Sequence, residues 1–271
     1  MNILITGGTG FLGRSLVKRL YDGNNLTIVA RNEGNLIKLK EQYPKINIIT
    51  GSIENEQIVS KACKDQEELY HLAAYKHVGL AETNTLQCTL SNIIGTLNLI
   101  EYFKGSLFVS ISTDKTAKMQ GVYGASKYIV EKLIKEKSLV NKDTRYVVPR
   151  YGNVIGSTGS IIPRWIEAAK KHQNITITDP LATRFFFTVD DAISLIFEAI
   201  HSGINGEPYI KEMKSCDIDT VASAIIEKYG YINNIDYIGL QEGENKHEWL
   251  SDDYTSEFAE KFTVEEFIKM I

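Results

Sequence analysis

The sequence is poor in cysteine and carries no excess of positive charge. Its 271 residues include three cysteines, and its formal net charge is −4. Cys63, Cys88 and Cys216 lack the paired spacing that marks a disulfide framework or a zinc site, so we expect reduced thiols and no metal centre. The charge balance gives no support to the binding of nucleic acid or of an anionic membrane.

Long apolar runs, internal repeats and low-complexity segments are also missing. No apolar run approaches the roughly 18 residues of a membrane-spanning helix. The first predicted strand begins at residue 2, which leaves no room for a signal peptide, so we expect a cytoplasmic protein. With 43% apolar and 24% charged residues, the composition is typical of a soluble globular protein. The length suffices for one large α/β domain with a small appended lobe.

The first glycines of the chain follow a short apolar run. Residues 2–6 predict a buried parallel strand, and a helical pattern begins directly after the glycine turn. Strand, glycine turn and helix are the context of a dinucleotide-binding site, because glycines let the backbone approach the pyrophosphate at the positive end of the helix. A plain tight turn is the alternative. The coenzyme contacts predicted in this turn are Gly7, Thr9, Gly10, Phe11, Leu12 and Gly13.

The end of the second predicted strand, residues 26–30, lacks an acid. NAD sites usually place an acid there for the ribose hydroxyls, whereas an arginine accommodates the 2′-phosphate of NADP. Arg31 and Asn32 follow this strand, so the sequence favours NADP; the alternative for Arg31 is a solvated loop charge. Further coenzyme contacts are predicted after the third and fourth strands, at Ser52, Ile53, Ala73 and Ala74.

Polar residues also follow the fourth strand, residues 69–74, at the edge of the sheet where doubly wound folds bind ligands. Lys76 is a candidate for substrate binding there. His71, on the apolar strand itself, is expected to be a core histidine and not a catalyst. A long helix is predicted over residues 86–103, and Asn92 on it is a candidate to point at the catalytic centre.

The segment 112–127, which reads STDKTAKMQGVYGASK, follows the fifth strand, residues 107–111. If Tyr123 begins a helix, Lys127 lies one turn further along the same face. A neighbouring ammonium lowers the pKa of a phenol, so that tyrosine can take a proton from a carbinol near neutrality. Thr113, Asp114 and Lys115 just upstream suggest a second proton-transfer task.

These elements predict a doubly wound parallel sheet, or Rossmann fold, with a smaller C-terminal substrate-binding lobe. The NADP-binding Rossmann domain is predicted to comprise residues 1–153 and 189–204. The lobe is predicted to comprise residues 154–188 and 205–271. Glycines and short polar side chains between the two parts suit a loop around a phosphorylated ligand.

TGGTGFLG at residues 6–13, with Tyr123-x-x-x-Lys127, resembles the extended short-chain dehydrogenase/reductase superfamily. The finer resemblance, over nearly the whole chain, is to the soluble inverting UDP-N-acetylglucosamine 4,6-dehydratases. The retaining glucose dehydratases have Asp-Glu where this chain has Asp114-Lys115, and simple 4-epimerases have small hydroxyl residues there. The stretches that carry the resemblance are AAYKHV at 73–78, STDK…YGASK, RYGNVIGSTGSIIP at 150–163, TRFFFT at 183–188 and GENKHE at 243–248.

The resemblance implies an NADP-dependent hydro-lyase that acts on a UDP-sugar. C4 is oxidised transiently, water is eliminated across C5–C6, and hydride returns to C6 with inversion at C5. Tyr123, assisted by Lys127, would deprotonate the C4 hydroxyl, and Thr113 would hydrogen-bond O4. Lys115 would take the C5 proton, and protonated Asp114 would help the C6 hydroxyl to leave.

The resemblance also implies substrate contacts and self-association. Asn153, Gly156 and Ser157 would hold the diphosphate, and Arg184 would add a charge-assisted bond. Arg150 and Glu248 are candidates for the sugar and uridine ends. The alternatives are a surface ion pair for Arg184 and a solvated acid for Glu248. The helices over 86–103 and 123–137 are where this superfamily pairs subunits, so we expect a homo-oligomer.

Several positions depart from the family pattern. Ser52 stands where an Asp is usual, Gln241-Glu242 where Arg-Pro is common, and Gly243-Glu244-Asn245 where Gly-Glu-Lys is usual; the Asn-Pro ahead of Tyr123 is missing. None of these is a predicted catalytic residue, so the prediction of the reaction class is better supported than the prediction of the sugar specificity. A nucleotide-sugar 4-epimerase or 4-reductase stays open, as does a non-catalytic NADP-sensing protein, although such proteins tend to lack the Tyr-x-x-x-Lys pair.

Overall fold

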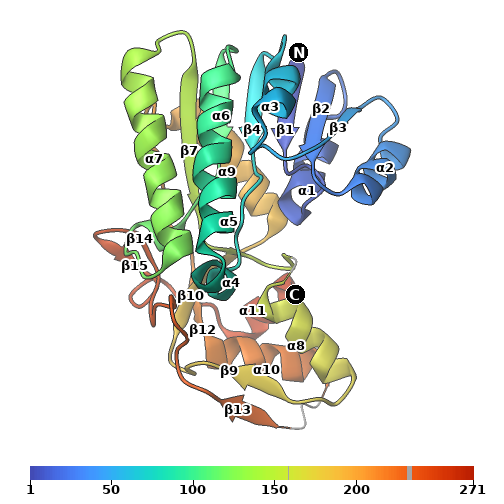
Figure 1. The fold of residues 1–271 in the computed structure, drawn as a ribbon. Coiled ribbons are helices and arrows are strands. Elements are labelled where there is room, and N and C mark those ends of the chain that lie inside the picture. Colours follow the sequence, from blue (N-terminus) through green and yellow to red (C-terminus); the bar gives the residue numbers. More distant parts are fainter. Residues whose placement is uncertain (158, 231–233) are drawn as a thin grey trace.

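A parallel sheet forms the larger part of the molecule, with strand order β11-β7-β5-β4-β1-β2-β3 (Figure 1). The computed structural model describes residues 1–157, 159–230 and 234–271. A short strand, β6 (Ser112–Thr113), continues the sheet beside β7. The seven strands in chain order are β1 (Asn2–Thr6), β2 (Asn25–Ala30), β3 (Asn47–Thr50), β4 (Glu68–His71), β5 (Leu107–Ser110), β7 (Arg145–Tyr151) and β11 (Pro208–Tyr209).

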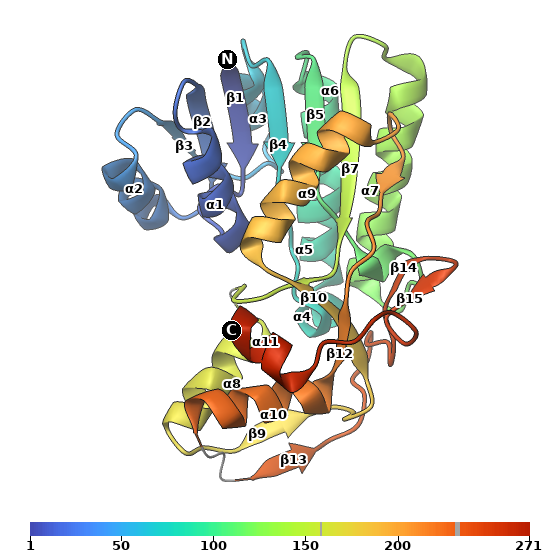
Figure 2. The same cartoon turned by 180° about the vertical axis from the view of Figure 1, so that it is seen from behind.

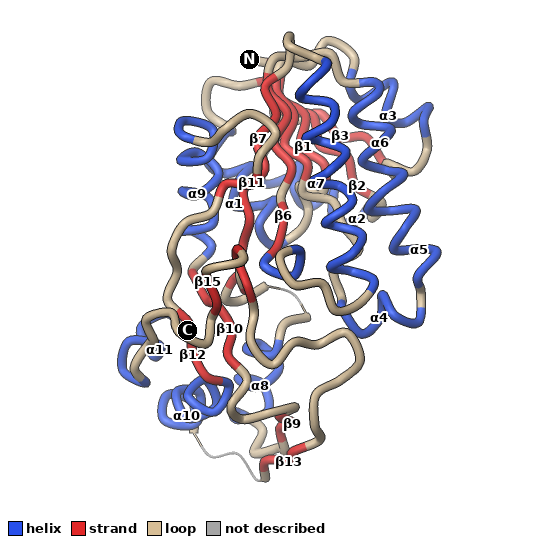
Figure 3. Tube along the Cα trace, turned by 90° about the vertical axis from the view of Figure 1, so that its left-hand side faces the viewer, coloured by secondary structure: helices blue, strands red, loops and turns tan. Residues whose placement is uncertain are grey.

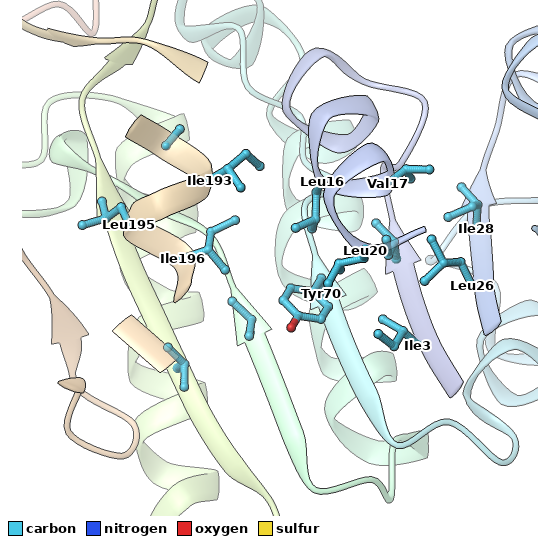
Figure 4. Close-up of a cluster of buried hydrophobic side chains, with 14 of the residues drawn as sticks. Ile3, Leu16, Val17, Leu20, Leu26, Ile28, Tyr70, Ile193, Leu195 and Ile196 are labelled. Carbon is cyan, nitrogen blue, oxygen red and sulfur yellow. The ribbon is translucent and has the colours of Figure 1, made fainter. Parts of the chain in front are cut away.

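Helices cover both faces of this sheet (Figure 2). One face packs against α1 (Phe11–Leu20), α2 (Glu33–Gln42) and α9 (Val189–Ser202). The other face packs against α3 (Glu56–Cys63), α6 (Gly95–Tyr102) and α7 (Val122–Val140). Strand residues alternate between the two apolar layers, as a doubly covered parallel sheet requires. Figure 4 shows part of the first layer, where side chains of α1 and α9 meet the sheet: Leu16, Val17, Leu20, Ile193 and Ile196.

The predicted helix over 86–103 is present, but it is interrupted. It runs as α5 (Thr85–Thr89), a π-helical turn η1 (Leu90–Ile94) and α6. The short helix α4 (Val78–Thr83) precedes it, and the 3₁₀ turn η2 (Asp114–Thr116) links β6 to the segment before α7. Single π-helical turns inside α-helices are frequently found at functional sites.

The remaining elements form a smaller lobe with its own apolar core (Figure 3). Helix α10 packs against α8 and α11, and Phe186 meets Phe267 edge-to-face with ring centroids 5.2 Å apart. The lobe elements are β8 (Asn153–Val154), α8 (Ile161–Lys170), β9 (Ile175–Ile177), β10 (Thr183–Phe187), β12 (Ser215–Asp217), α10 (Ile218–Tyr229), β13 (Ile235–Tyr237), β14 (Trp249–Ser251), β15 (Tyr254–Thr255) and α11 (Val264–Met270).

The doubly wound sheet predicted from the sequence is confirmed, with one difference in the division of the chain. The prediction assigns residues 205–271 to the lobe, but β11 pairs in parallel with β7. The first residues of that segment therefore extend the large sheet, because the chain leaves α9 beside β7 before it crosses to the lobe. Thr158, in the predicted phosphate loop, lies outside the described residues.

Two further predictions concern buried residues. His71 is a core histidine, as predicted: it is 2% exposed, and its ring nitrogens lie 2.7 Å from Thr6 Oγ1 and 2.9 Å from Thr96 Oγ1. The three cysteines are free and buried. Among the described residues, no helix is long and apolar enough to span a bilayer.

Candidate active site

The carboxyl ends of the parallel strands face the smaller lobe (Figures 1 and 2). The glycine turn after β1, the loop after β4 and η2 after β6 all lie at this edge. Helix α7 begins here, and Gly124 in its first turn packs against η2. A Cβ at Gly124 would come within 2.5 Å of the Lys115 carbonyl oxygen. This close approach brings Tyr123 and Lys127 beside Thr113, Asp114 and Lys115.

Lys115 lies between two carboxylates that come from different parts of the fold. Its Nζ is 3.0 Å from Asp114 Oδ1 and 3.3 Å from Glu248 Oε1. Thr113 Oγ1 donates to the same Asp114 oxygen at 2.8 Å. Glu248 precedes β14 of the lobe and is 1% exposed, so the alternative of a solvated acid is excluded.

The two carboxyl groups beside Lys115 differ in acidity. Burial raises the pKa of Asp114, and the charge of Lys115 only partly offsets this. Burial would also raise the pKa of Glu248, but the cations Lys115 and Arg184 outweigh it, and that pKa is lowered. Within the described residues, Asp114 Oδ2 is buried without a hydrogen-bond partner. Environments that separate the pKa values of two neighbouring carboxyls are typical of acid–base sites.

The same carboxylates act on the Lys115 amine. Burial alone would lower the pKa of Lys115, yet Asp114 and Glu248 together raise it above its ordinary value. The two carboxylates thus stabilise the ammonium form of Lys115 relative to the neutral amine.

Tyr123 is buried beside Thr113 and Lys115. Burial raises its pKa to about 12, and the charge that opposes this most is that of Lys115, with help from a hydrogen bond to Thr113. The sequence assigned this effect to Lys127, and the structure adds Lys115 as a cation that acts on the phenol. Burial also lowers the pKa of Lys127 to about 8, with Glu131 acting in the opposite direction.

Glu131, one helical turn beyond Lys127, is a residue that the sequence interpretation missed. It is 3% exposed and accepts hydrogen bonds from Arg150 Nη2 at 2.7 Å and Nε at 3.1 Å. It also accepts from Ser112 and, at 3.1 Å, from Thr116. The Tyr123–Lys127 spacing continued by four residues would have found this acid.

Arg150 is consequently committed to the protein interior. Besides its ion pair with Glu131, its Nη1 donates to the carbonyl oxygen of Leu250 in β14. These contacts give Arg150 a structural role that the sequence did not predict: it links α7 to β14, the strand that follows Glu248.

Asn92 is likewise committed to the protein. Its amide donates to the Tyr75 carbonyl at 3.0 Å and to Ser126 Oγ at 2.9 Å, and it accepts from the Tyr75 amide at 2.7 Å. The side chain thus fixes the loop after β4 against Ser126 on α7, between Tyr123 and Lys127.

The glycine turn fits a dinucleotide. A Cβ at Gly7, whose φ is +73°, would lie 2.7 Å from the Ala73 amide nitrogen, and one at Gly13 would lie 2.3 Å from the Gly7 carbonyl oxygen. A Cβ at Gly10 would meet one atom, the Gly7 carbonyl oxygen, at 3.2 Å. Gly10 is the N-cap residue of α1, and no side chain caps this helix. Open amide groups at a helix N-terminus with no side chain over them form an anion site suited to a pyrophosphate. Thr9, Phe11 and Leu12 belong to this turn.

The other predicted coenzyme residues lie at the ends of β2, β3 and β4. Arg31 is exposed directly after β2, and the Asn32 side chain caps α2 by accepting from the Asn35 amide at 2.9 Å. Ser52 Oγ lies 3.5 Å from the Glu54 amide. Ile53 is part of the core. Ala73 adjoins Gly7, with Ala74 next to it.

The loop after β8 lies against the predicted coenzyme turn. A Cβ at Gly156 would meet the Phe11 ring at 3.1 Å, and one at Gly159 would meet the His77 ring at 2.3 Å. Burial and the charges of Lys76 and Arg164 lower the pKa of His77. His77 thus adjoins the loop that carries Gly156 and Ser157, and the charges of Lys76 and Arg164 act on His77. His77 and Arg164 were not predicted from the sequence, although His77 is adjacent to Lys76.

Arg184, predicted to bind the diphosphate, is 9% exposed. Its Nη1 donates to the carbonyl oxygens of Thr183 at 2.9 Å and Lys246 at 3.0 Å, and its Nε is 3.6 Å from Glu248 Oε1. A surface ion pair, the alternative, is excluded by this burial. Asn153 lies on β8 and is paired with Phe186 of β10, the strand that also carries Arg184.

A family model described as polysaccharide biosynthesis protein matches residues 3–269. The chain belongs to this family. It is an extended short-chain dehydrogenase/reductase, in the superfamily of nucleotide-sugar dehydratases and epimerases. An inverting UDP-N-acetylglucosamine 4,6-dehydratase of Campylobacter jejuni is 33% identical, over 100% of this chain and 84% of the relative. A protein of Rickettsia bellii named UDP-glucose 4-epimerase is 31% identical, over 92% of this chain and 76% of the relative.

Solved structures share the fold. The X-ray structure of Pen from Bacillus thuringiensis superimposes with a TM-score of 0.93 at 30% identity, over 100% of this chain and 96% of that one. The dTDP-glucose 4,6-dehydratase DesIV of Streptomyces venezuelae, solved with NAD, gives a TM-score of 0.86 at 17% identity, over 100% of this chain and 95% of DesIV. Structural neighbours of the family thus bind a nicotinamide coenzyme at this fold.

Proposed function

We propose that this polysaccharide biosynthesis protein is an NADP-dependent hydro-lyase, a UDP-N-acetylglucosamine 4,6-dehydratase with inversion at C5. The observation that carries the proposal is the arrangement around Lys115. The Lys115 amine lies between Glu248 and Asp114, whose pKa is raised, and the charges of Lys115 and Asp114 act on Tyr123. Elimination of water needs this acid and base in addition to the tyrosine that serves oxidation at C4.

Each residue has one task in this proposal. Tyr123 takes the proton of the C4 hydroxyl, and Thr113, which hydrogen-bonds Tyr123 and Asp114, orients O4. The 4-ketone acidifies C5–H, whose proton passes to Lys115 once the amine has given its own proton to solvent. Asp114 gives its proton to the leaving C6 hydroxyl. A general base or acid contributes about a hundred- to ten-thousand-fold to such a step.

The glycine turn, Ala73 and Ala74 would hold the coenzyme, with Lys127 near the ribose and nicotinamide end. When bound, the coenzyme supplies the acceptor of the C4 hydride and its donor to C6. Lys76, Asn153, Gly156, Ser157 and Arg184 would hold the diphosphate of the UDP-sugar, and the nearby Arg164 and His77 support an anion in this place.

Arg31 carries the choice of NADP over NAD. Exposed at the end of β2, it can pair with a 2′-phosphate, which NAD lacks. We expect Arg31→Ala to weaken NADP binding by about tenfold, the equivalent of one surface charge-assisted contact, and to leave NAD binding unchanged. Fluorescence titration with both reduced coenzymes measures this, with Lys38→Ala on α2 as the control. Equal losses for both coenzymes would contradict the assignment.

Mass spectrometry of the reaction with UDP-N-acetylglucosamine tests the proposed reaction. We expect the sugar nucleotide to lose the mass of one water without consumption of added coenzyme, because hydride is returned within each turnover. A product of unchanged mass would contradict the proposal.

The second candidate is a nucleotide-sugar 4-epimerase, which the similarity to the Rickettsia bellii protein favours. It would use Tyr123 and Lys127 and leave C6 intact. Such an enzyme has no use for a protonated Asp114 beside Lys115, and the mass measurement separates the two candidates.

We also propose a homo-oligomer formed by the helices α5–α6 and α7. Their outer surface carries exposed apolar side chains, which is typical of an interaction site. These exposed side chains are Leu86, Ile94, Leu97 and Ile129. Light scattering of the purified protein gives the mass of the particle in solution directly, and a monomer would contradict the proposal.

A further inference from the structure

Glu248 is the residue that the lobe contributes to the catalytic lysine. Its Oε1 lies 3.3 Å from Lys115 Nζ and 3.6 Å from Arg184 Nε. Asn245 donates to the other oxygen at 3.3 Å, and the Glu248 amide donates to Ser256 at 2.8 Å. The side chain is 2% exposed. A carboxylate held by three side chains, on a backbone that is itself hydrogen-bonded to Ser256, is not free to follow a ligand, so it acts on Lys115 from a constant position.

The titratable and charged groups that face Lys115 come from the turn η2, from the helix α7 and from two segments of the lobe. Asp114 lies in the same turn η2, Tyr123 lies on α7, and Glu248 and Arg184 come from the lobe. If Asp114 is protonated as the acid of the elimination, it carries no charge at that moment. Among the described residues, Glu248 is then the ionised carboxylate that remains in contact with the Lys115 amine.

We propose that Glu248 is a positioning residue for Lys115: it holds the amine at the sugar and stabilises the ammonium that forms as the C5 proton is taken. This inference rests on the proposed dehydratase activity. In the step, the C5–H bond breaks and its proton joins Lys115 Nζ, while the electron pair stays on C5, conjugated with the 4-ketone. The C6–O bond then breaks with a proton from Asp114, which gives water and a C5=C6 double bond. Positive charge develops on Nζ, 3.3 Å from Glu248 Oε1.

A negative charge at this distance has two opposing effects on the rate. It makes Lys115 a stronger base, which favours the transfer of the proton from carbon. It also keeps the resting amine protonated, so the reaction needs a higher pH to start. Removal of the charge should therefore lower the maximal rate and move the rise of the rate to lower pH. A residue with a merely structural role would lower the rate without the shift in pH.

The direct test is a titration of Lys115 in the folded protein. With ¹³C-labelled lysine, NMR follows each side-chain amine, and Lys115→Met identifies the signal. We expect Lys115 to titrate above its ordinary value near 10.5, and Glu248→Gln to lower this by at least about one unit, as an opposite charge at such a distance typically does. Glu257→Gln is the control, because Glu257 lies in the same segment but pairs with His247 at 3.8 Å.

The kinetic test follows water release against pH. We expect Glu248→Gln to lower the plateau and to shift the rise of the rate to lower pH by the same interval as the titration, with Glu248→Asp in between. An unshifted rise, or a Lys115 signal that titrates at or below 10.5 in the wild type, would overturn the inference. If Glu248→Gln does not fold, the titration of Lys115 in the wild type and the pH dependence of the rate in Glu248→Asp test the inference. Wild-type protein that releases no water would instead overturn the proposed function, while the titration still decides whether Glu248 governs Lys115.

Discussion

Lys115→Met is expected to abolish the release of water and to leave the binding of coenzyme and nucleotide sugar in place. The amine that takes the C5 proton is gone, so elimination should fall by about a hundred- to ten-thousand-fold, the usual contribution of a general base. Oxidation at C4 should persist, because Tyr123 and Lys127 are untouched. It should need a higher pH, since the charge of Lys115 lowers the pKa of Tyr123 in the wild type.

The measurement combines mass spectrometry of the sugar with the absorbance of reduced nicotinamide. Lys118→Met is the matched control: Lys118 is exposed and lies over the Trp249 ring at 4.5 Å, so its loss should leave dehydration nearly unchanged. Full dehydratase activity of Lys115→Met would remove Lys115 from its role. Loss of coenzyme binding would show that the lysine acts on the fold of the site instead.

Glu131→Ala should be the most destabilising single substitution among the acids of α7. It leaves the buried guanidinium of Arg150 without its partner, and breaking a buried ion pair in this way costs about 3 to 5 kcal/mol of the free energy of unfolding. Urea denaturation measures this, and Glu136→Ala, at an exposed position of the same helix, should cost under about 1 kcal/mol.

A double substitution distinguishes the cost of an unpaired buried charge from the cost of the lost hydrogen bonds at this position. Glu131→Leu with Arg150→Met removes both charges, and we expect it to be more stable than Glu131→Ala, because no unpaired charge stays buried. A double variant as unstable as the single one would show that the hydrogen bonds to Ser112 and Thr116, and not the ion pair, stabilise the site.

The sequence predicted best those parts of the site that are contiguous. The turn from Gly7 to Gly13 and the stretch from Thr113 to Lys127 each follow one strand, so strand order and spacing suffice to place them at the same edge of the sheet. The core role of His71 follows from its apolar strand in the same way.

The sequence could not predict the protein contacts of polar side chains whose partners are distant in the sequence. Asn92 bonds the Tyr75 backbone, Arg150 pairs with Glu131, and Glu248 reaches Lys115 from the lobe. Nothing in the local pattern tells whether a polar side chain will meet a ligand or a protein group, because both satisfy its hydrogen bonds. The pKa of Tyr123 could not be read from the sequence for a related reason: its largest cause is burial, a property of the whole fold.

NMR of the product formed from UDP-N-acetylglucosamine in D₂O tests the central claim most directly. Proton transfer through Lys115 predicts a 4-keto-6-deoxy sugar with a methyl group at C6, deuterium at C5 and inverted configuration there. A product that retains the C6 hydroxyl, or one with protium at C5, would contradict the account.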